Sequence, residues 1–204
     1  VVPGLEGGGE ILLTWTGARA LFFEQTDPYS GATPNYVQRQ VYGREAHPGE
    51  KPYILDIPPF LLLLYFPIGA LESALIARAV SLFISEAALL VLLILSLRLA
   101  DWQPRRLYLV MFFLLIPVSF YSLWSLMDGS QAILLGLLLA GTLLALRAES
   151  DELAGLLITL SLQHWEAVGP FLALILLWVI SHARWRVFTG MFMSLFIVYG
   201  FDTA

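Results

Sequence analysis

The sequence predicts an all-α protein that crosses a membrane several times and carries a polar N-terminal region. Apolar residues make up 58% of the chain and its mean hydropathy is +0.77, whereas a soluble domain has about 45–50% apolar residues. Charged residues contribute only 13%, about half of the usual ~25%. From Ile57 to Tyr199 the chain alternates apolar stretches with short polar breaks, which is typical of a polytopic helical membrane protein.

The polar breaks are of two alternating kinds. Basic side chains gather at 98–106, at Arg147 and at 182–186. The other breaks carry acids or amides, at 128–131, at 163–166 and at Asp202. Because Lys and Arg gather on the cytoplasmic side of membrane proteins, the basic breaks are predicted to be cytoplasmic. Residues 1–57 are then extracytoplasmic.

Residues 1–56 form the predicted extracytoplasmic loop region. Apolar positions recur at helical spacing after Glu10, which predicts a short amphipathic helix there, and 36–42 form a candidate second helix. Residues 57–204 form the predicted transmembrane region, which opens with a short membrane-embedded helix at 60–69. A span needs about 20 apolar residues. The predicted spans are 73–97, 107–124, 132–146, 153–162, 167–180 and 187–201.

The segments 153–162 and 167–180 allow two interpretations, because each is short for a span on its own. They form either one long kinked span or a hairpin of two short helices. The hairpin places all the basic breaks on one side of the membrane, whereas a single kinked span places 182–186 on the opposite side. The charge pattern therefore favours the hairpin.

Composition and chain ends limit the classes of function. The net charge of −5 argues against a nucleic-acid partner, which would bind a concentrated basic patch. The chain has no cysteine, so disulfides and thiolate metal sites are excluded, and we predict no metal and no cofactor. It starts at Val1 without a basic leader and ends in or just beyond an apolar stretch. We expect a piece from the N-terminal part of a longer membrane protein, with at least one helix preceding Val1.

Three segments carry a resemblance to a known family: 10–29, 56–67 with its Pro58-Pro59 pair, and the Asp-Gly-Ser-Gln sequence at 128–131. In order and spacing they resemble motifs of the GT-C glycosyltransferases. The most similar branch depends on polyprenyl-phosphate mannose and includes the mycobacterial phosphatidylinositol mannoside mannosyltransferases. A Leu-Ala-Gly-Leu-Leu segment at 153–157 adds to the resemblance. The match is divergent: the family's Asp, Tyr and Lys-Pro pair are replaced by Glu10, Ile57 and Gln163-His164.

The resemblance implies an integral membrane glycosyltransferase of a bacterial plasma membrane. Such an enzyme moves a hexose or pentose, expected here to be mannose, from a polyprenyl-phosphate donor to an extracytoplasmic lipid or glycan acceptor, with inversion. One carboxylate takes the proton of the acceptor hydroxyl, and polar or cationic groups stabilise the leaving phosphate. The expected partners are membrane lipids, the polyprenyl-phosphate sugar, the acceptor and other membrane subunits.

Glu10 is the expected catalytic base, and Asp27 is the second candidate. Each has a structural alternative, because an acid suits a helix N-terminus and Asp before Pro28 suits a turn. Asp128 and Gln131 are expected to begin a membrane helix, where Asp128 would act as a cap. The expected substrate-binding residues are Trp15 and Tyr29 for stacking on a sugar, Arg19 and His164 for phosphate, and Asp128, Gln131 and Glu166.

Two other functions remain open at this stage. The chain is alternatively a non-catalytic structural subunit of a membrane complex, or a transporter of lipid-linked substrates. A transporter would line its path with charged residues, and Arg78 and Glu86 lie inside one predicted span. Because eight residues separate them on one helix face, a structural ion pair is the alternative explanation.

Overall fold

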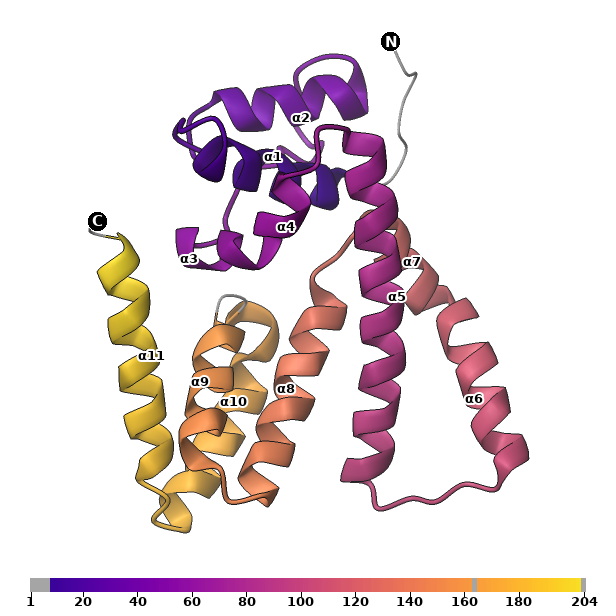
Figure 1. The fold of residues 1–204 in the computed structure, drawn as a ribbon, viewed down its shortest axis with the longest axis vertical. Coiled ribbons are helices and arrows are strands. Elements are labelled where there is room, and N and C mark those ends of the chain that lie inside the picture. Colours follow the sequence, from indigo (N-terminus) through magenta and orange to yellow (C-terminus); the bar gives the residue numbers. More distant parts are fainter. Residues whose placement is uncertain (1–7, 163–164, 203–204) are drawn as a thin grey trace. The chain divides into compact units, whose positions relative to one another are not determined.

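A computed structural model of the chain describes residues 8–162 and 165–202. These residues form helices joined by loops, with no β-strand among them (Figure 1), so the all-α prediction is confirmed. The helices are α1 (Gly9–Phe22), α2 (Ala32–Tyr42), α3 (Pro59–Leu62), the 3₁₀ helix η1 (Leu63–Tyr65), α4 (Phe66–Gly69), α5 (Ala74–Leu99), α6 (Arg106–Val118), α7 (Phe120–Asp128), α8 (Ala132–Arg147), α9 (Asp151–Ser161), α10 (Trp165–Ser181) and α11 (Arg186–Asp202).

The chain divides into two units, and each has its own helix contacts. Unit 1 comprises Val1–Ala87 and Leu115–Gln131, and unit 2 comprises Ala88–Leu114 and Ala132–Ala204. The boundary between them falls within α5 and within α6. The polar N-terminal region falls in the same unit as the short helices α3, η1 and α4, and the boundary at residue 56 stays a prediction.

Helix α1 is the centre of unit 1. It contacts α2, α3, η1, α4 and α7. Consecutive residues from Ile11 to Trp15 are all buried, so α1 is covered on more than one face. The prediction of an amphipathic helix near Glu10 is right about where the helix begins and wrong about its surface position. The short helices around α1 cover the face that the predicted pattern leaves to solvent.

Helix α5 can cross a membrane by its length and composition. It has 26 residues and a mean hydropathy of 2.5 over its most apolar window, of which only 17% is buried. The span predicted at 107–124 is instead bent by 47° between α6 and α7. Pro117 lies inside α6, where it removes a helical hydrogen bond, and the Ser119 side chain then caps α7. Together α6 and α7 are apolar enough for one broken span.

The remaining apolar helices are shorter than a straight span. Helices α8 and α10 and the segment Arg186–Ile197 of α11 have 10–17 residues, fewer than the about 20 that cross a hydrocarbon core. The segments 153–162 and 167–180 form two helices, α9 and α10, and not one kinked helix. The helices from α8 to α11 end within two residues of the predicted bounds. That each of them crosses a membrane stays a prediction.

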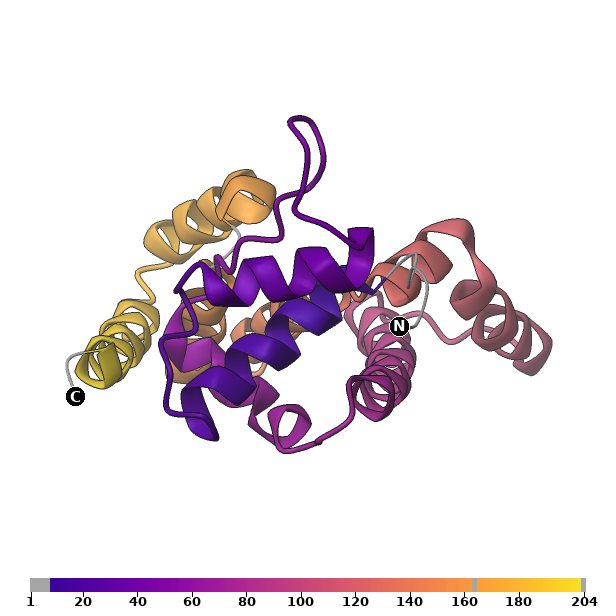
Figure 2. The same cartoon turned by 90° about the horizontal axis from the view of Figure 1, so that it is seen from above.

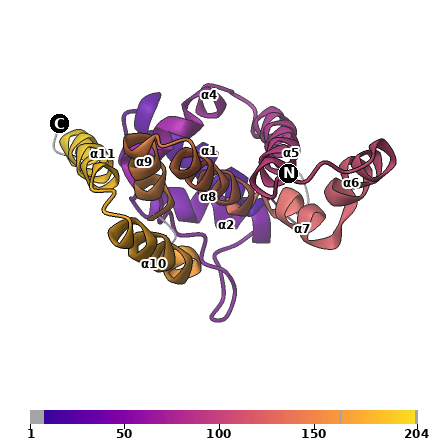
Figure 3. The same ribbon diagram turned by 90° about the horizontal axis from the view of Figure 1, so that it is seen from below.

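In unit 2, α9 lies between α8 and α11 (Figure 3). The backbones of α9 and α11 approach each other at Gly155 and Gly190. A Cβ on Gly155 would lie 2.1 Å from the carbonyl oxygen of Val187, and a Cβ on Gly190 would lie 2.2 Å from that of Glu152. No side chain larger than hydrogen fits at either position without moving a helix.

Small and hydroxyl-bearing residues continue this interface by one helical turn. Thr159 follows Gly155 by four residues on α9, and Ser194 follows Gly190 by four residues on α11. The Thr159 hydroxyl donates a hydrogen bond of 3.4 Å to the Met191 carbonyl oxygen across the interface. Small residues at this spacing let membrane helices approach closely.

The basic breaks meet at one end of unit 2. Arg147 donates to the carbonyl oxygen of Arg98 at 3.2 Å and forms an ion pair of 2.6 Å with Asp101. Arg184 donates to the carbonyl oxygen of Leu146 at 2.6 Å. These contacts join the C-terminal ends of α5, α8 and α10, as the hairpin interpretation requires. The side of a membrane that this end faces stays a prediction.

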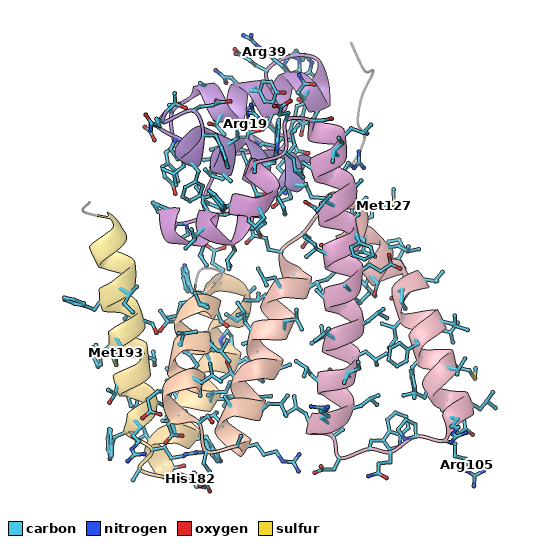
Figure 4. All side chains as sticks on the ribbon, in the orientation of Figure 1. Arg19, Arg39, Arg105, Met127, His182 and Met193 are labelled. Atoms are coloured by element: carbon cyan, nitrogen blue, oxygen red, sulfur yellow. The ribbon has the colours of Figure 1, made fainter. Side chains whose placement is uncertain are left out.

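Many large apolar side chains of the helices are exposed. Phe83 on α5 is 73% exposed and Phe196 on α11 is 81% exposed. Met127 on α7 and Met193 on α11, labelled in Figure 4, are 57% and 60% exposed. Apolar exposure on this scale marks a surface that contacts lipid or another protein.

We predict that Gly155→Ala destabilises the chain, because its methyl group would enter the backbone of α11. The expected loss is about 1–3 kcal/mol, the usual cost of overpacking, measured as a lower midpoint of unfolding in detergent. Gly169→Ala on α10 is the matched control, since nothing lies within 4 Å of a Cβ there. It should be neutral or stabilising, and equal losses in both variants would contradict the close approach of α9 and α11.

Candidate functional site

The candidate site lies in unit 1, at the N-terminal end of α1. Glu10 stands in the first turn of this helix, and its carboxylate forms an ion pair with the ammonium group of Lys51. The Glu10 side chain is 24% exposed and that of Lys51 is 51% exposed, so a ligand can reach the pair. The fold thus brings the predicted base to a cation that follows it by 41 residues.

Lys51 belongs to a loop that runs out from the end of α2 and returns (Figure 2). Hydrogen bonds hold this loop in place. The side chain of Gln38 accepts from the Ala46 N–H at 2.9 Å and donates to the Pro52 carbonyl oxygen at 2.5 Å. The Tyr42 hydroxyl donates to the Lys51 carbonyl oxygen at 3.2 Å. Gln38 therefore ties both halves of the loop to α2.

Arg44 and Glu50 close the same loop. Two hydrogen bonds of 2.8 Å join the guanidinium to both carboxylate oxygens, and the carboxylate also accepts from the His47 N–H at 2.8 Å. The hydrogen bond from Arg44, followed by the one from the His47 backbone, lowers the pKa of Glu50 from 4.5 to about 2. Glu50 is therefore ionised, and the ion pair intact, at neutral pH.

Two glycines allow close contacts at the start of α1. Gly8 has a φ of 84°, a left-handed conformation that favours glycine, and a Cβ there would lie 3.0 Å from Nε of Arg78. A Cβ on Gly9 would lie 2.2 Å from the ring of Tyr53. The guanidinium of Arg78 therefore lies beside the N-terminus of α1, where the helix dipole is positive.

Arg78 does not pair with Glu86. The ion pairs among the described residues include neither side chain. Eight residues span about 12 Å along a helix, whereas the side chains that pair on one helix are three or four residues apart. The predicted structural pair of Arg78 and Glu86 is therefore wrong. Arg78 lies instead near the N-terminus of α5, against Gly8.

Tyr65 of η1 is half-buried, and the charge of Glu10 acts on its hydroxyl. Burial, and after it the negative charge of Glu10, raises the pKa of Tyr65 to about 12. The hydroxyl is therefore protonated at any physiological pH and can donate a hydrogen bond. The site thus holds one carboxylate with an ammonium group and a phenol close by.

The turn at 128–131 also lies against α1. Gly129 has a φ of 73°, and a Cβ there would lie 2.0 Å from Cγ1 of Ile11. Asp128 is the last residue of α7, and α8 begins at Ala132, so the prediction that Asp128 begins and caps a helix is wrong. A left-handed glycine after Asp128 ends α7. Gln131 is 8% exposed, and the Asp128 side chain lies outside the described part of the structure.

Trp15 and Arg19 take structural roles. Trp15 is only 5% exposed, its indole N–H donates to the Leu71 carbonyl oxygen at 3.0 Å, and it lines an open groove together with Arg19. Arg19 (Figure 4) forms an ion pair of 2.8 Å with Glu24 and also donates to Leu71. Nine residues separate Arg19 from Glu10, about 14 Å along α1. The low exposure of Trp15 does not favour sugar stacking, and its role in binding a sugar stays a prediction.

Asp27 lies at this other end of α1. Its carboxylate accepts from the Tyr29 N–H at 2.9 Å, which is the turn geometry proposed as its structural alternative. Asp27 also lines an open groove of about 500 Å³ together with Arg19, Glu24 and Tyr36. Tyr29 is 43% exposed, and its hydroxyl donates to the Ile57 carbonyl oxygen at 2.6 Å. The two acids proposed as the base thus belong to two different places in unit 1.

The last predicted site residues belong to unit 2. Glu166 is exposed in the first turn of α10. Gln163 and His164 lie outside the described residues. Within 8–162 and 165–202, no three His, Cys, Asp or Glu side chains are placed to hold a metal ion.

The sequence did not single out the polar groups that surround Glu10. The predicted phosphate-binding residues are Arg19 and His164, and no pattern in the sequence selects Lys51, Tyr65 or Gln38. Their positions depend on the loop after α2 and on the short helix η1, which bring distant segments to α1. The only usable signal was Lys51 itself, the lone lysine of the chain.

Comparison with known proteins adds no relative. A scan against protein-family models, a search of curated proteins and a search of solved structures each found no match.

We predict that Arg44→Gln raises the pKa of Glu50 toward 4.5, because the variant loses the strongest of the hydrogen bonds that lower it. A depressed pKa stabilises the fold above the unfolded value, and this contribution is lost as the pH falls through about 2. Carboxyl NMR titration of Glu50 measures the change. Arg39→Gln is the control, because Arg39 forms an ion pair with Glu45, at 3.8 Å, and not with Glu50. An unchanged Glu50 titration in Arg44→Gln would contradict the closed loop.

Proposed function

We propose that this chain is part of an integral membrane glycosyltransferase of the GT-C type. It transfers a hexose or pentose, mannose by resemblance, from a polyprenyl-phosphate donor to an extracytoplasmic lipid or glycan acceptor. The observation that carries the proposal is the reachable carboxylate of Glu10 at the N-terminus of α1, with Lys51 paired to it and Tyr65 nearby.

A polytopic membrane setting is part of the proposal. Helix α5 is long and apolar enough to cross a membrane, and the α6–α7 pair is apolar enough for a broken span. The exposed apolar side chains of these helices suit a lipid environment. The small-residue interface of α9 and α11 supports the same setting, because membrane helices associate through close packing.

Glu10 is the proposed general base. The acceptor oxygen attacks the anomeric carbon from the face opposite the phosphate, its proton passes to the Glu10 carboxylate, and the bond from carbon to phosphate oxygen breaks. The polyprenyl phosphate leaves with the bonding electron pair, and the configuration at the anomeric carbon inverts. General-base assistance of this kind accelerates a reaction by about 10²–10⁴-fold.

Lys51 and Arg78 are the proposed phosphate-binding cations, in place of the predicted Arg19 at the other end of α1. Lys51 is half exposed and can exchange Glu10 for a donor phosphate, which would leave the carboxylate free to accept a proton. Arg78 has no carboxylate partner among the described residues and lies beside the N-terminus of α1. Positive groups at this end would stabilise the charge that develops on the leaving phosphate.

The structure favours this proposal over a transporter of lipid-linked substrates. A charged path would need cations and acids along the length of α5. Arg78 instead lies near the N-terminus of α5, against Gly8. Glu86 is exposed and forms no ion pair with Arg78. An assay of glycosyl transfer distinguishes an enzyme from a non-catalytic subunit.

We predict that Glu10→Gln lowers glycosyl transfer by about 10²–10⁴-fold, because the amide cannot take the acceptor proton. Transfer from a polyprenyl-phosphate sugar is measured with the protein in membranes or detergent. Glu24→Gln is the matched control: it makes the same change in an exposed acid paired with Arg19 and should keep full activity.

Each outcome of the assay has a defined meaning. Full activity in Glu10→Gln together with loss in Asp27→Asn would move the base to the groove near Arg19. The absence of transfer by the unmodified protein from any polyprenyl-phosphate sugar would contradict the enzymatic proposal and favour a structural subunit.

A further inference from the structure

An apolar groove of about 420 Å³ runs between α8 and α10 in unit 2. Its lining residues on α10 follow helical spacing and so form one stripe, and three residues of α8 face them. The lining comprises Leu143, Leu146 and Arg147 of α8 and Phe171, Leu174, Ile175 and Trp178 of α10. The stripe from Phe171 to Trp178 is about 10 Å long, and its Leu174 is 66% exposed.

A polar pocket of about 660 Å³ continues from the groove at Trp178, which lines both. His182 (Figure 4) directly follows the last residue of α10, and its ring stacks on the Trp178 indole with 4.3 Å between the ring centroids. The pocket is also lined by Glu149, Asp151, Arg184 and Arg186. An apolar groove that ends at an aromatic ring and charged groups is suited to bind an amphiphile at a membrane interface.

The charges of the pocket select the headgroup. Asp151 and Arg184 neutralise each other in an ion pair of 2.6 Å, largely buried. Arg186 and Glu149 are exposed, and neither belongs to an ion pair of the described residues. Among the described residues, the pocket therefore offers the unpaired charges of Arg186 and Glu149, which complement a phosphate and an ammonium group on the same molecule.

His182 adds a second group for the phosphate. Its Nδ1 lies 2.9 Å from the Trp178 carbonyl oxygen and 2.9 Å from the Ser181 hydroxyl. This contact holds the ring in place on the indole and leaves Nε2 as the nitrogen for an external partner. Arg147 cannot take this role as readily, because its guanidinium already binds Asp101 and the carbonyl oxygen of Arg98.

We infer that the groove and the pocket together bind one phosphatidylethanolamine, a phospholipid whose headgroup carries a phosphate and a primary ammonium group and no carboxylate. Its phosphate binds Arg186 and His182, its ammonium group binds Glu149, and one acyl chain lies along the stripe from Trp178 toward Phe171. This inference rests on the membrane setting of the proposed function and is independent of glycosyl transfer. The site belongs to the basic end of unit 2 and shares no residue with those proposed for catalysis, which belong to unit 1.

Photo-crosslinking in lipid nanodiscs tests the inference with the protein and phospholipids that carry a diazirine in one acyl chain. Phosphatidylethanolamine should label peptides of α8 and α10 more than phosphatidylglycerol or phosphatidylcholine does. Arg186→Gln should lower this labelling about fivefold, which corresponds to about 1 kcal/mol for one basic side chain at a membrane surface. Arg105→Gln is the matched control, because Arg105 (Figure 4) is exposed and lies outside both linings.

Two further variants separate the headgroup from the chain. Glu149→Gln should remove the preference for phosphatidylethanolamine over phosphatidylglycerol. Leu174→Trp should block the groove and lower labelling by every lipid, whereas Leu177→Trp, a neighbour that is 63% exposed and outside the groove, should leave it unchanged. Labelling that is equal for all three lipids, or equal in Leu174→Trp and Leu177→Trp, would overturn the inference.

These results are distinguishable from failure of the proposed enzyme. Selective labelling without any glycosyl transfer would leave the lipid site standing and remove the enzymatic proposal. Transfer without selective labelling would do the reverse.

Discussion

The arrangement of unit 2 depends on the contact between the backbones of α9 and α11 at Gly155 and Gly190. A Cβ at either position would lie within 2.2 Å of a carbonyl oxygen on the other helix, so glycine is required for the helices to meet. Because α9 also packs on α8, its position brings the ends of α8 and α10 together. Arg184 then reaches the carbonyl oxygen of Leu146. The polar pocket and the apolar groove are consequences of that arrangement.

In unit 1 the corresponding constraint is polar. The loop that follows α2 is polar from Gly43 to Lys51, and side-chain hydrogen bonds to its backbone hold it in place. Gln38 is buried and makes one hydrogen bond to each half of the loop, so both the oxygen and the nitrogen of its side-chain amide have a partner. The ion pair of Arg44 and Glu50 is exposed and would contribute little alone. The ion pair closes the loop, and the closed loop places Lys51 next to Glu10.

The helices could be predicted from sequence because apolar runs and their polar breaks are local features. The start of α1 near Glu10, the two helices at 153–162 and 167–180, and the common location of the basic breaks follow from such patterns. The errors concern neighbours that local patterns do not contain. The sequence places Trp15 in an outer loop, but the segments around α1 leave it only 5% exposed. Asp128 looked like a helix start, but Gly129 ends the helix that precedes it.

The sequence by itself determined the helical class, the apolar segments and the sign of charge at each break, because each depends on residues adjacent in the chain. Only the tertiary structure decided which charges meet. Lys51 pairs with Glu10, Arg78 lies against Gly8 and not beside Glu86, and Arg186 and Glu149 share a pocket. The reason is physical: an ion pair forms over a few ångströms, and its partners here come from segments that only loop closure and helix packing bring within that range.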